Sequence, residues 1–180
     1  MGDGLGTVAN RTFPLAYLIT FSCYGKRLHG EDAETVDRRT NIYGTPFIPP
    51  SPKIVEIEEQ QMAQSPFALN ADQREIVLRA IQEVCAYRAW RLWAVHVRSD
   101  HIHVVAGGQQ ASEKSMNDFK TYASRALNRL SPNESDRKRW ARHGSTVYLW
   151  MPEDVASAVD YVVRQQGDPM AVWENPDKSL

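Results

Sequence analysis

The stretch that most constrains the fold is RLWAVHVRSDHIHVVAG, at residues 91–107. It holds two apolar runs, rich in β-branched residues, on either side of the short polar segment 98–100. Runs of this kind around a polar turn predict two antiparallel strands joined by a hairpin. A sheet must therefore lie at the centre of the molecule. The rest of the chain has to supply the other strands and the helices that cover them.

The flanking segments supply these elements in a regular order. Strands are predicted at residues 15–24 and 146–150, and helices at residues 70–90, 112–130 and 152–167. Asn70 is the expected N-cap of the first helix, and Pro152 and Gly167 bound the last one. The order strand, helix, strand, strand, helix, strand, helix predicts an α+β fold. We expect a ferredoxin-like antiparallel sheet with its helices packed on one face.

The length of 180 residues predicts a single domain over residues 1–180. Residues 26–70 are rich in proline, glycine and charge, and predict a long loop insertion with a helical turn near residues 54–64. The apolar share of 42% is typical of a soluble protein, and no apolar run is long enough to span a membrane. With only Cys23 and Cys85 no disulfide framework is expected, which favours the cytoplasm.

His101 and His103 occupy alternate positions of the second apolar run, so both rings point to one face of the predicted strand. A histidine-triad hydrolase would need a third histidine where Val105 stands, and a two-histidine phosphoesterase would need a second His-x-Thr/Ser element. A zinc site would need more sulfur ligands. Two interpretations remain open: a pair of metal ligands, or two histidines on an exposed sheet face.

The last predicted helix offers partners for such a pair. Tyr161 and Gln165 lie four residues apart and share a helix face. Gln165 brings a carbonyl oxygen, the type of ligand that suits Mg²⁺ or Mn²⁺, and Tyr161 brings a phenol that can attack a phosphate polarised by such an ion. The alternative for Tyr161 is a tyrosine that packs its amphipathic helix on the sheet.

The motifs HIH at residues 101–103 and DYVVRQQ at residues 160–166 together resemble those of the IS200/IS605-type single-tyrosine transposases and their REP-associated relatives. The resemblance covers most of the chain. It implies that Tyr161 attacks a DNA phosphodiester to form a 5′-phosphotyrosine. It also implies that His101, His103 and Gln165, or Gln166 in its place, hold Mg²⁺ or Mn²⁺. The expected enzyme cleaves and rejoins single-stranded DNA beside hairpins, as a homodimer in which the tyrosine helix often serves the other subunit.

Cations are expected along the path of such a DNA strand. Residues 112–143 carry eight basic and four acidic residues, although the net charge of the whole chain is −1. The predicted DNA-binding residues are Arg98, Lys120, Arg125, Arg129, Arg137, Lys138, Arg139 and Arg142. Two alternatives to a transposase stay open: a nickase of the replication-initiator or relaxase type, and a domesticated nucleic-acid-binding protein that does not cleave.

Overall fold

The computed structural model describes residues 12–26 and 62–178. Its strands and helices follow one another as β1 (Ala16–Cys23), α2 (Ala71–Tyr87), β2 (Arg91–Val97), β3 (His101–Gly107), α3 (Ser112–Leu130), the 3₁₀ turn η1 (Pro132–Glu134), β4 (Trp140–Leu149), α4 (Pro152–Arg164) and β5 (Ala171–Glu174). Most of the predicted insertion at residues 26–70, including most of its helical turn, lies outside the described residues. Among those described, no helix is both long and apolar enough to cross a membrane.

The five strands form one sheet in the order β4-β1-β3-β2-β5, and every neighbouring pair is antiparallel. The arrangement of β1 to β4 with α2 and α3 between them confirms the predicted ferredoxin-like α+β fold. The edge strand β5 was missed by the sequence analysis. It has only four residues, AVWE, which are too few to establish an alternating pattern.

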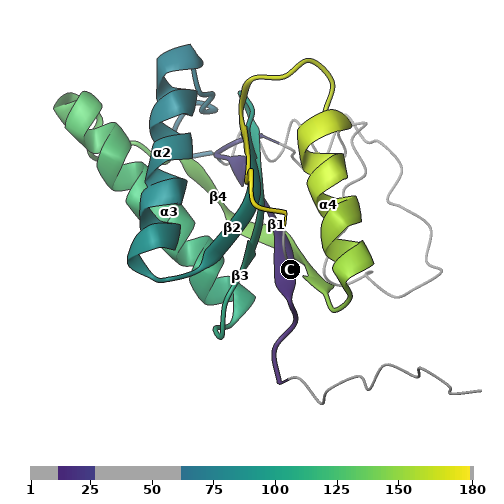
Figure 1. Cartoon of the computed structure of the whole chain (residues 1–180). Helices are drawn as coiled ribbons and strands as arrows, with labels where there is room; N and C mark the ends of the chain where they lie inside the picture. The colour runs from purple at the N-terminus through teal and green to yellow at the C-terminus, as the bar shows by residue number, and fades with distance from the viewer. Residues whose placement is uncertain (1–11, 27–61, 179–180) are drawn as a thin grey trace, which may run out of the picture.

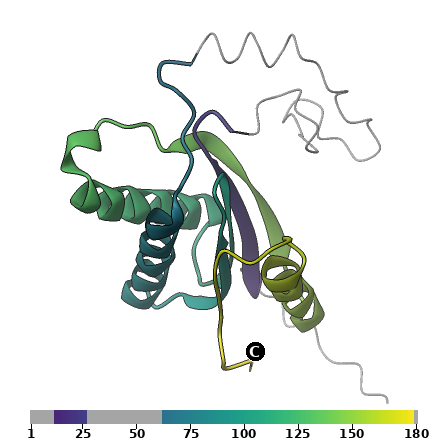
Figure 2. The same ribbon diagram turned by 90° about the horizontal axis from the view of Figure 1, so that it is seen from above.

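The helices lie on both faces of the sheet, so the prediction of a single covered face was wrong. Figures 1 and 2 show α2 and α3 on one side and α4 alone on the other. The reason is that β3 is buried along its whole length. Val104 packs in the core under α2 and α3, whereas Val105, which points the other way, packs against the apolar residues of α4. Consecutive apolar residues such as Val104 and Val105 are typical of a strand covered on both faces.

Local sequence explains where the elements begin and end. Asn70 caps α2 as predicted: its side chain accepts from the N–H of Gln73, whose side chain in turn accepts from the N–H of Asn70. The hairpin between β2 and β3 also turns where predicted, because the N–H of Arg98 donates to the carbonyl of His101 across a two-residue turn (2.9 Å).

Strand β4 is longer than predicted, because it begins at Trp140 within the basic segment that was interpreted as a loop. Trp140 packs edge-on against Phe21 of β1, and its indole nitrogen donates to Ser124 of α3 (2.8 Å). These contacts hold the start of β4 against the sheet despite its polar sequence. A bulge between this start and the main ladder accommodates the extra residues.

The core under α2 and α3 generates the first prediction. Phe119 is 0% exposed and packs edge-on against Trp90. We expect Phe119→Ala to lower the free energy of unfolding by about 3–5 kcal/mol in urea titrations. Tyr87→Ala, at a side chain 73% exposed, is the control and should change it by about 0.5 kcal/mol or less. Equal losses in the two variants would contradict this description of the core.

Candidate active site

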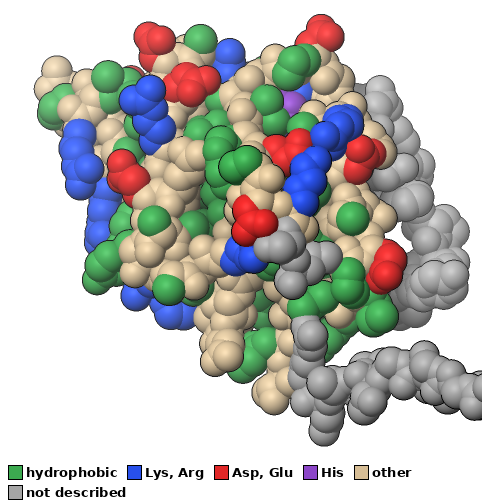
Figure 3. Space-filling view, in the orientation of Figure 1, with side chains coloured by type: hydrophobic (Ala, Val, Ile, Leu, Met, Phe, Trp, Pro, Cys, Tyr) green, Lys and Arg blue, Asp and Glu red, His purple; other side chains and the backbone are tan. Residues whose placement is uncertain are grey.

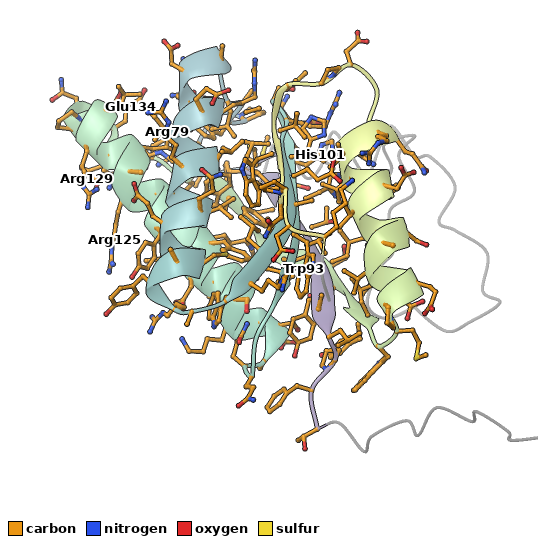
Figure 4. All side chains as sticks on the ribbon, viewed as in Figure 1. Arg79, Trp93, His101, Arg125, Arg129 and Glu134 are labelled. Atoms are coloured by element: carbon orange, nitrogen blue, oxygen red, sulfur yellow. The ribbon has the colours of Figure 1, made fainter. Side chains whose placement is uncertain are left out.

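The two histidines of β3 lie side by side on the face that α4 covers. His101 and His103 are 7% and 2% exposed, and their ring centroids are 4.8 Å apart with the rings edge to face. Figure 4 shows His101 between the sheet and α4. The interpretation of these histidines as a pair on an exposed sheet face is therefore wrong, because both rings are buried.

Each ring is held by a bond to its Nδ1 atom. His101 Nδ1 lies 2.7 Å from Oδ1 of Asp100, and His103 Nδ1 lies 2.8 Å from the hydroxyl of Thr20 on β1. An ionised carboxylate only accepts hydrogen bonds, so His101 donates from Nδ1, and in the neutral ring the lone pair is then on Nε2. In the described part of the chain this Nε2 is buried and has no hydrogen-bond partner. A carboxylate behind a histidine with an available Nε2 is the usual support of a metal-binding imidazole.

Asp100 and Thr20 were missed by the sequence analysis. Asp100 directly precedes His101, so its position was a usable signal. Thr20 could not be found without the register of the sheet, which places it opposite His103 in the antiparallel pair β1–β3.

Tyr161 lies next to the histidines of its own chain. Val155, Ala158 and Val162 pack the apolar side of α4 onto the sheet, and this places Tyr161 at the edge of the contact, 39% exposed. Its ring centroid is 5.6 Å from that of His103, and the two rings meet edge to face. The structure thus brings a partly exposed tyrosine against His103, and the role of Tyr161 as a nucleophile stays a prediction.

The two glutamines follow at the end of α4. The backbone N–H of Gln165 donates to the carbonyl of Tyr161 (3.1 Å), and its side-chain amide donates to Asp160 (2.7 Å). The side-chain amide of Gln166 donates to the Tyr161 carbonyl (3.3 Å). Both glutamines lie one turn from the tyrosine. Which of them serves as a metal ligand stays a prediction.

The donor set allows a test of the predicted metal. Among the described residues, no group of three or more His, Cys, Asp or Glu side chains could hold an ion. A cation on His101 and His103 would therefore take its other ligands from amide, phosphate or water oxygens. Hard divalent ions such as Mg²⁺ and Mn²⁺ accept such ligands, whereas a structural zinc ion does not. The residues present fit the predicted ions.

Arg98 also reaches this end of the sheet. It precedes the hairpin turn, and its guanidinium donates to the backbone carbonyl of Asp168 in the α4–β5 connection (3.1 Å). Arg98 is half-buried, and it is the residue that pairs with His101 across the turn. The structure therefore places one of the predicted DNA-binding cations close to the candidate site.

A third histidine on this face, His96 of β2, was missed. It is 0% exposed and lies opposite His103 in the β2–β3 pair. Its Nδ1 lies 3.0 Å from the carbonyl oxygen of Val162, and its Nε2 accepts from the N–H of Met170 (3.2 Å). Burial lowers the pKa of His96, so the neutral ring is favoured.

Three of the predicted DNA-binding cations make contacts inside the fold. Lys120 is 9% exposed, and its ammonium group donates to the carbonyls of Ala141 (3.0 Å) and His143 (3.2 Å) in the β4 bulge. Arg139 is 3% exposed and donates to Asn128 and to the carbonyl of Glu134. The third is Arg137, whose guanidinium donates to the carbonyls of residues 65 and 66. The bonds of Lys120 and Arg139 hold the basic segment together internally, and those of Arg137 tie it to residues 65 and 66.

The remaining predicted cations are exposed or partly exposed and lie elsewhere. Figure 4 shows Arg125 and Arg129 pointing outward from α3, on the other side of the sheet from His101. Figure 3 shows lysine and arginine side chains along this outer edge. Arg142 is exposed on β4, and Lys138 lies over the ring of Tyr24 (5.6 Å to the centroid). DNA contacts by these residues stay a prediction.

One protein-family model matches part of this chain. Residues 64–152 match the model described as "Transposase IS200 like". The match includes both histidines and ends where α4 begins, so Tyr161 lies beyond it. A search of curated proteins gives no match.

Two solved structures resemble this chain. One is a REP-associated tyrosine transposase bound to a REP hairpin, with 12% identity and a TM-score of 0.47 over 92% of this chain and 72% of that one. The other is a putative transposase from Deinococcus radiodurans, with 13% identity and a TM-score of 0.44 over 93% of this chain and 100% of that one.

Burial of Lys120 makes the stability of the fold depend on pH. It lowers the pKa of this side chain to about 8, whereas an unfolded lysine titrates near pH 10.4. Between these values the unfolded chain binds more protons, so this group makes the folded state more stable as the pH rises. We expect the free energy of unfolding of the wild type, minus that of Lys120→Met, to increase from pH 7.5 to pH 9.5 in urea titrations.

The control for this prediction is Lys114→Met, at an exposed lysine of the same helix. Its difference from the wild type should stay nearly constant over the same pH range. A pH-independent difference for Lys120→Met would contradict the prediction.

Proposed function

We propose that this chain, whose residues 64–152 match the IS200-like transposase family model, cleaves and rejoins single-stranded DNA through a tyrosine nucleophile, Tyr161. The observation behind this proposal is the contact between the Tyr161 ring and His103, beside the available Nε2 of His101. A nucleophile at a paired-histidine site is the arrangement that metal-assisted phosphoryl transfer needs. The partial exposure of Tyr161 leaves room for a DNA strand to approach it.

His101 and His103, with the side-chain oxygen of Gln165 or Gln166, would hold Mg²⁺ or Mn²⁺ in this proposal. When bound, the ion supplies Lewis-acid polarisation of the scissile phosphate. Asp100 fixes the tautomer of His101, and Thr20 holds the ring of His103. These two residues hold the two imidazole rings in place.

In the cleavage step, the phenol oxygen of Tyr161 bonds to phosphorus while the bond from phosphorus to the 3′ oxygen breaks. The phenol loses its proton, and the leaving 3′ oxygen takes one up. The products are a 5′-phosphotyrosine and a free 3′-OH. Because the new ester replaces a phosphodiester, a 3′-OH can later attack it and rejoin a strand. In this proposal Arg98 pairs with the phosphate charge; its guanidinium bonds to the carbonyl of Asp168 in the α4–β5 connection, which supports this role.

The substrate in this proposal is single-stranded DNA next to a hairpin, as the family resemblance implies. A homodimer also stays part of the proposal. The edge strand β4 is available for it, with Val147 and Tyr148 53% and 48% exposed. The active site itself we propose to be assembled within one chain, since α4 packs on its own sheet.

The nucleophile and the metal ligands can be tested on one substrate. A 5′-labelled hairpin oligonucleotide with single-stranded flanks, incubated with Mn²⁺, should give the wild type a labelled 3′-OH product and a protein–DNA adduct that resists denaturation. Tyr161→Phe should give neither and still bind the DNA. His101→Ala and His103→Ala should slow adduct formation by about 100-fold or more.

Tyr122→Phe, at a tyrosine on the opposite face of the sheet, is the matched control and should react like the wild type. Cleavage by Tyr161→Phe at the wild-type rate would overturn the nucleophile. Adding a second strand with a free 3′-OH tests whether the phosphotyrosine can be rejoined to DNA, and a non-cleaving binder gives no adduct at all.

Assembly of the site within one chain predicts the outcome of a mixing experiment. When His101→Ala and Tyr161→Phe chains are mixed, incubated and given DNA, the adduct yield should not rise above that of either variant alone. Restored cleavage would show that the tyrosine helix of one chain serves the histidines of another, and would overturn this part of the proposal.

A further inference from the structure

His96 makes two hydrogen bonds to one short segment of the backbone. Its Nδ1 bonds to the carbonyl of Val162 within α4, and its Nε2 accepts from the N–H of Met170, just before β5. The carbonyl group only accepts and the N–H only donates, so both bonds form only when the ring is neutral and carries its proton on Nδ1. With the side chain 0% exposed, water cannot replace either bond.

The two bonds bracket the candidate glutamine ligands, and the first of them is formed next to the tyrosine. Val162 directly follows Tyr161, and its carbonyl belongs to the last turn of α4. Gln165 and Gln166 lie between the two anchored groups. The ring of His96 therefore fixes both ends of the segment 162–170, which begins directly after the tyrosine and contains the candidate glutamine ligands.

Two neighbouring contacts act on the same segment. Arg98, two residues along β2, donates to the carbonyl of Asp168. Strand β5 pairs with β2 so that Val172 lies opposite His96. The end of α4 is thus attached to β2, the strand next to the one that carries the histidine pair.

We infer that His96 is a positioning residue for the tyrosine: it holds the end of α4 so that Tyr161 faces the histidines of its own chain. This inference rests on the proposed function. A leucine at this position would fill a similar volume in the core, but it would leave two buried backbone groups without partners and the helix end without an anchor. A displacement of about 1 Å at a reacting group can lower a rate by about 100-fold.

The test compares His96→Leu, which loses both bonds, with His96→Asn, whose amide nitrogen can take the place of Nδ1 and donate to Val162. Val95→Ala is the matched control, because Val95 is equally buried and packs on the other face of the sheet. Each variant is assayed where circular dichroism shows it to be folded. The measurements are the dissociation constant for the hairpin oligonucleotide and the single-turnover rate of adduct formation with Mn²⁺.

We expect His96→Leu to bind DNA within about twofold of the wild type and to form the adduct at least about tenfold more slowly. His96→Asn should recover part of this rate, and Val95→Ala should keep the wild-type rate per folded molecule. An adduct rate for folded His96→Leu equal to that of the wild type would overturn the inference. So would equal losses of rate in the Leu and Asn variants, since the bond to Val162 would then have no effect.

A second measurement does not depend on activity. In the wild type without metal or DNA, long-range ¹H–¹⁵N NMR spectra should show His96 neutral with its proton on Nδ1. The amide of Met170 should be protected from hydrogen exchange, and this protection should be lost in His96→Leu and retained in Val95→Ala. A proton on Nε2, or an unprotected Met170 amide in the wild type, would overturn the anchor.

The two proposals fail in different ways. If the wild type forms no adduct, or if Tyr161→Phe forms one, the proposed function fails, and the role of His96 in tyrosine positioning fails with it. If the wild type is active, Tyr161→Phe is inactive and folded His96→Leu reacts normally, only the inference about His96 fails.

Discussion

The burial of β3 on both faces is the constraint on which the rest of the structure depends. A strand with apolar side chains in both directions needs a layer on each side, so α2 and α3 cover one face and α4 has to cover the other. The two histidines lie on the face that α4 covers. The same packing that completes the core therefore brings the tyrosine of α4 to the imidazoles of β3.

The hydrogen bonds around the histidines show a division of roles among similar side chains. His101 has a carboxylate on Nδ1 and an Nε2 with no partner in the described structure, so it is prepared for a ligand. His96, one strand away, has both ring nitrogens bonded to backbone, so it is prepared to hold a position. Sequence position does not distinguish these roles, since each histidine stands in an apolar strand. The hydrogen-bond partner of each ring nitrogen does distinguish them.

Much of the fold was predictable because it follows from local patterns. Residues that are neighbours in the sequence form the cap of α2, the polar turn before His101 and the apolar spacing of the helices. The layer of α4 on the second face of the sheet was not predicted, although the consecutive apolar residues Val104 and Val105 of β3 were a usable signal. The start of β4 depends on contacts of Trp140 with residues far away in the sequence, which no local pattern contains. For the site, the motifs predicted His101, His103 and Tyr161 together. Thr20 and His96 could be found only from strand register.

The packing of α4 on its own sheet has a consequence for kinetics. A nucleophile that is attached to the same folded unit as its metal ligands meets them at an effective concentration fixed by the fold, not by the amount of protein in solution. In the proposed enzyme, each chain would then carry out the first strand cleavage by itself, and the rate per chain would not change on dilution. Any pairing of two chains would serve the later step, in which two DNA ends have to be held together for exchange.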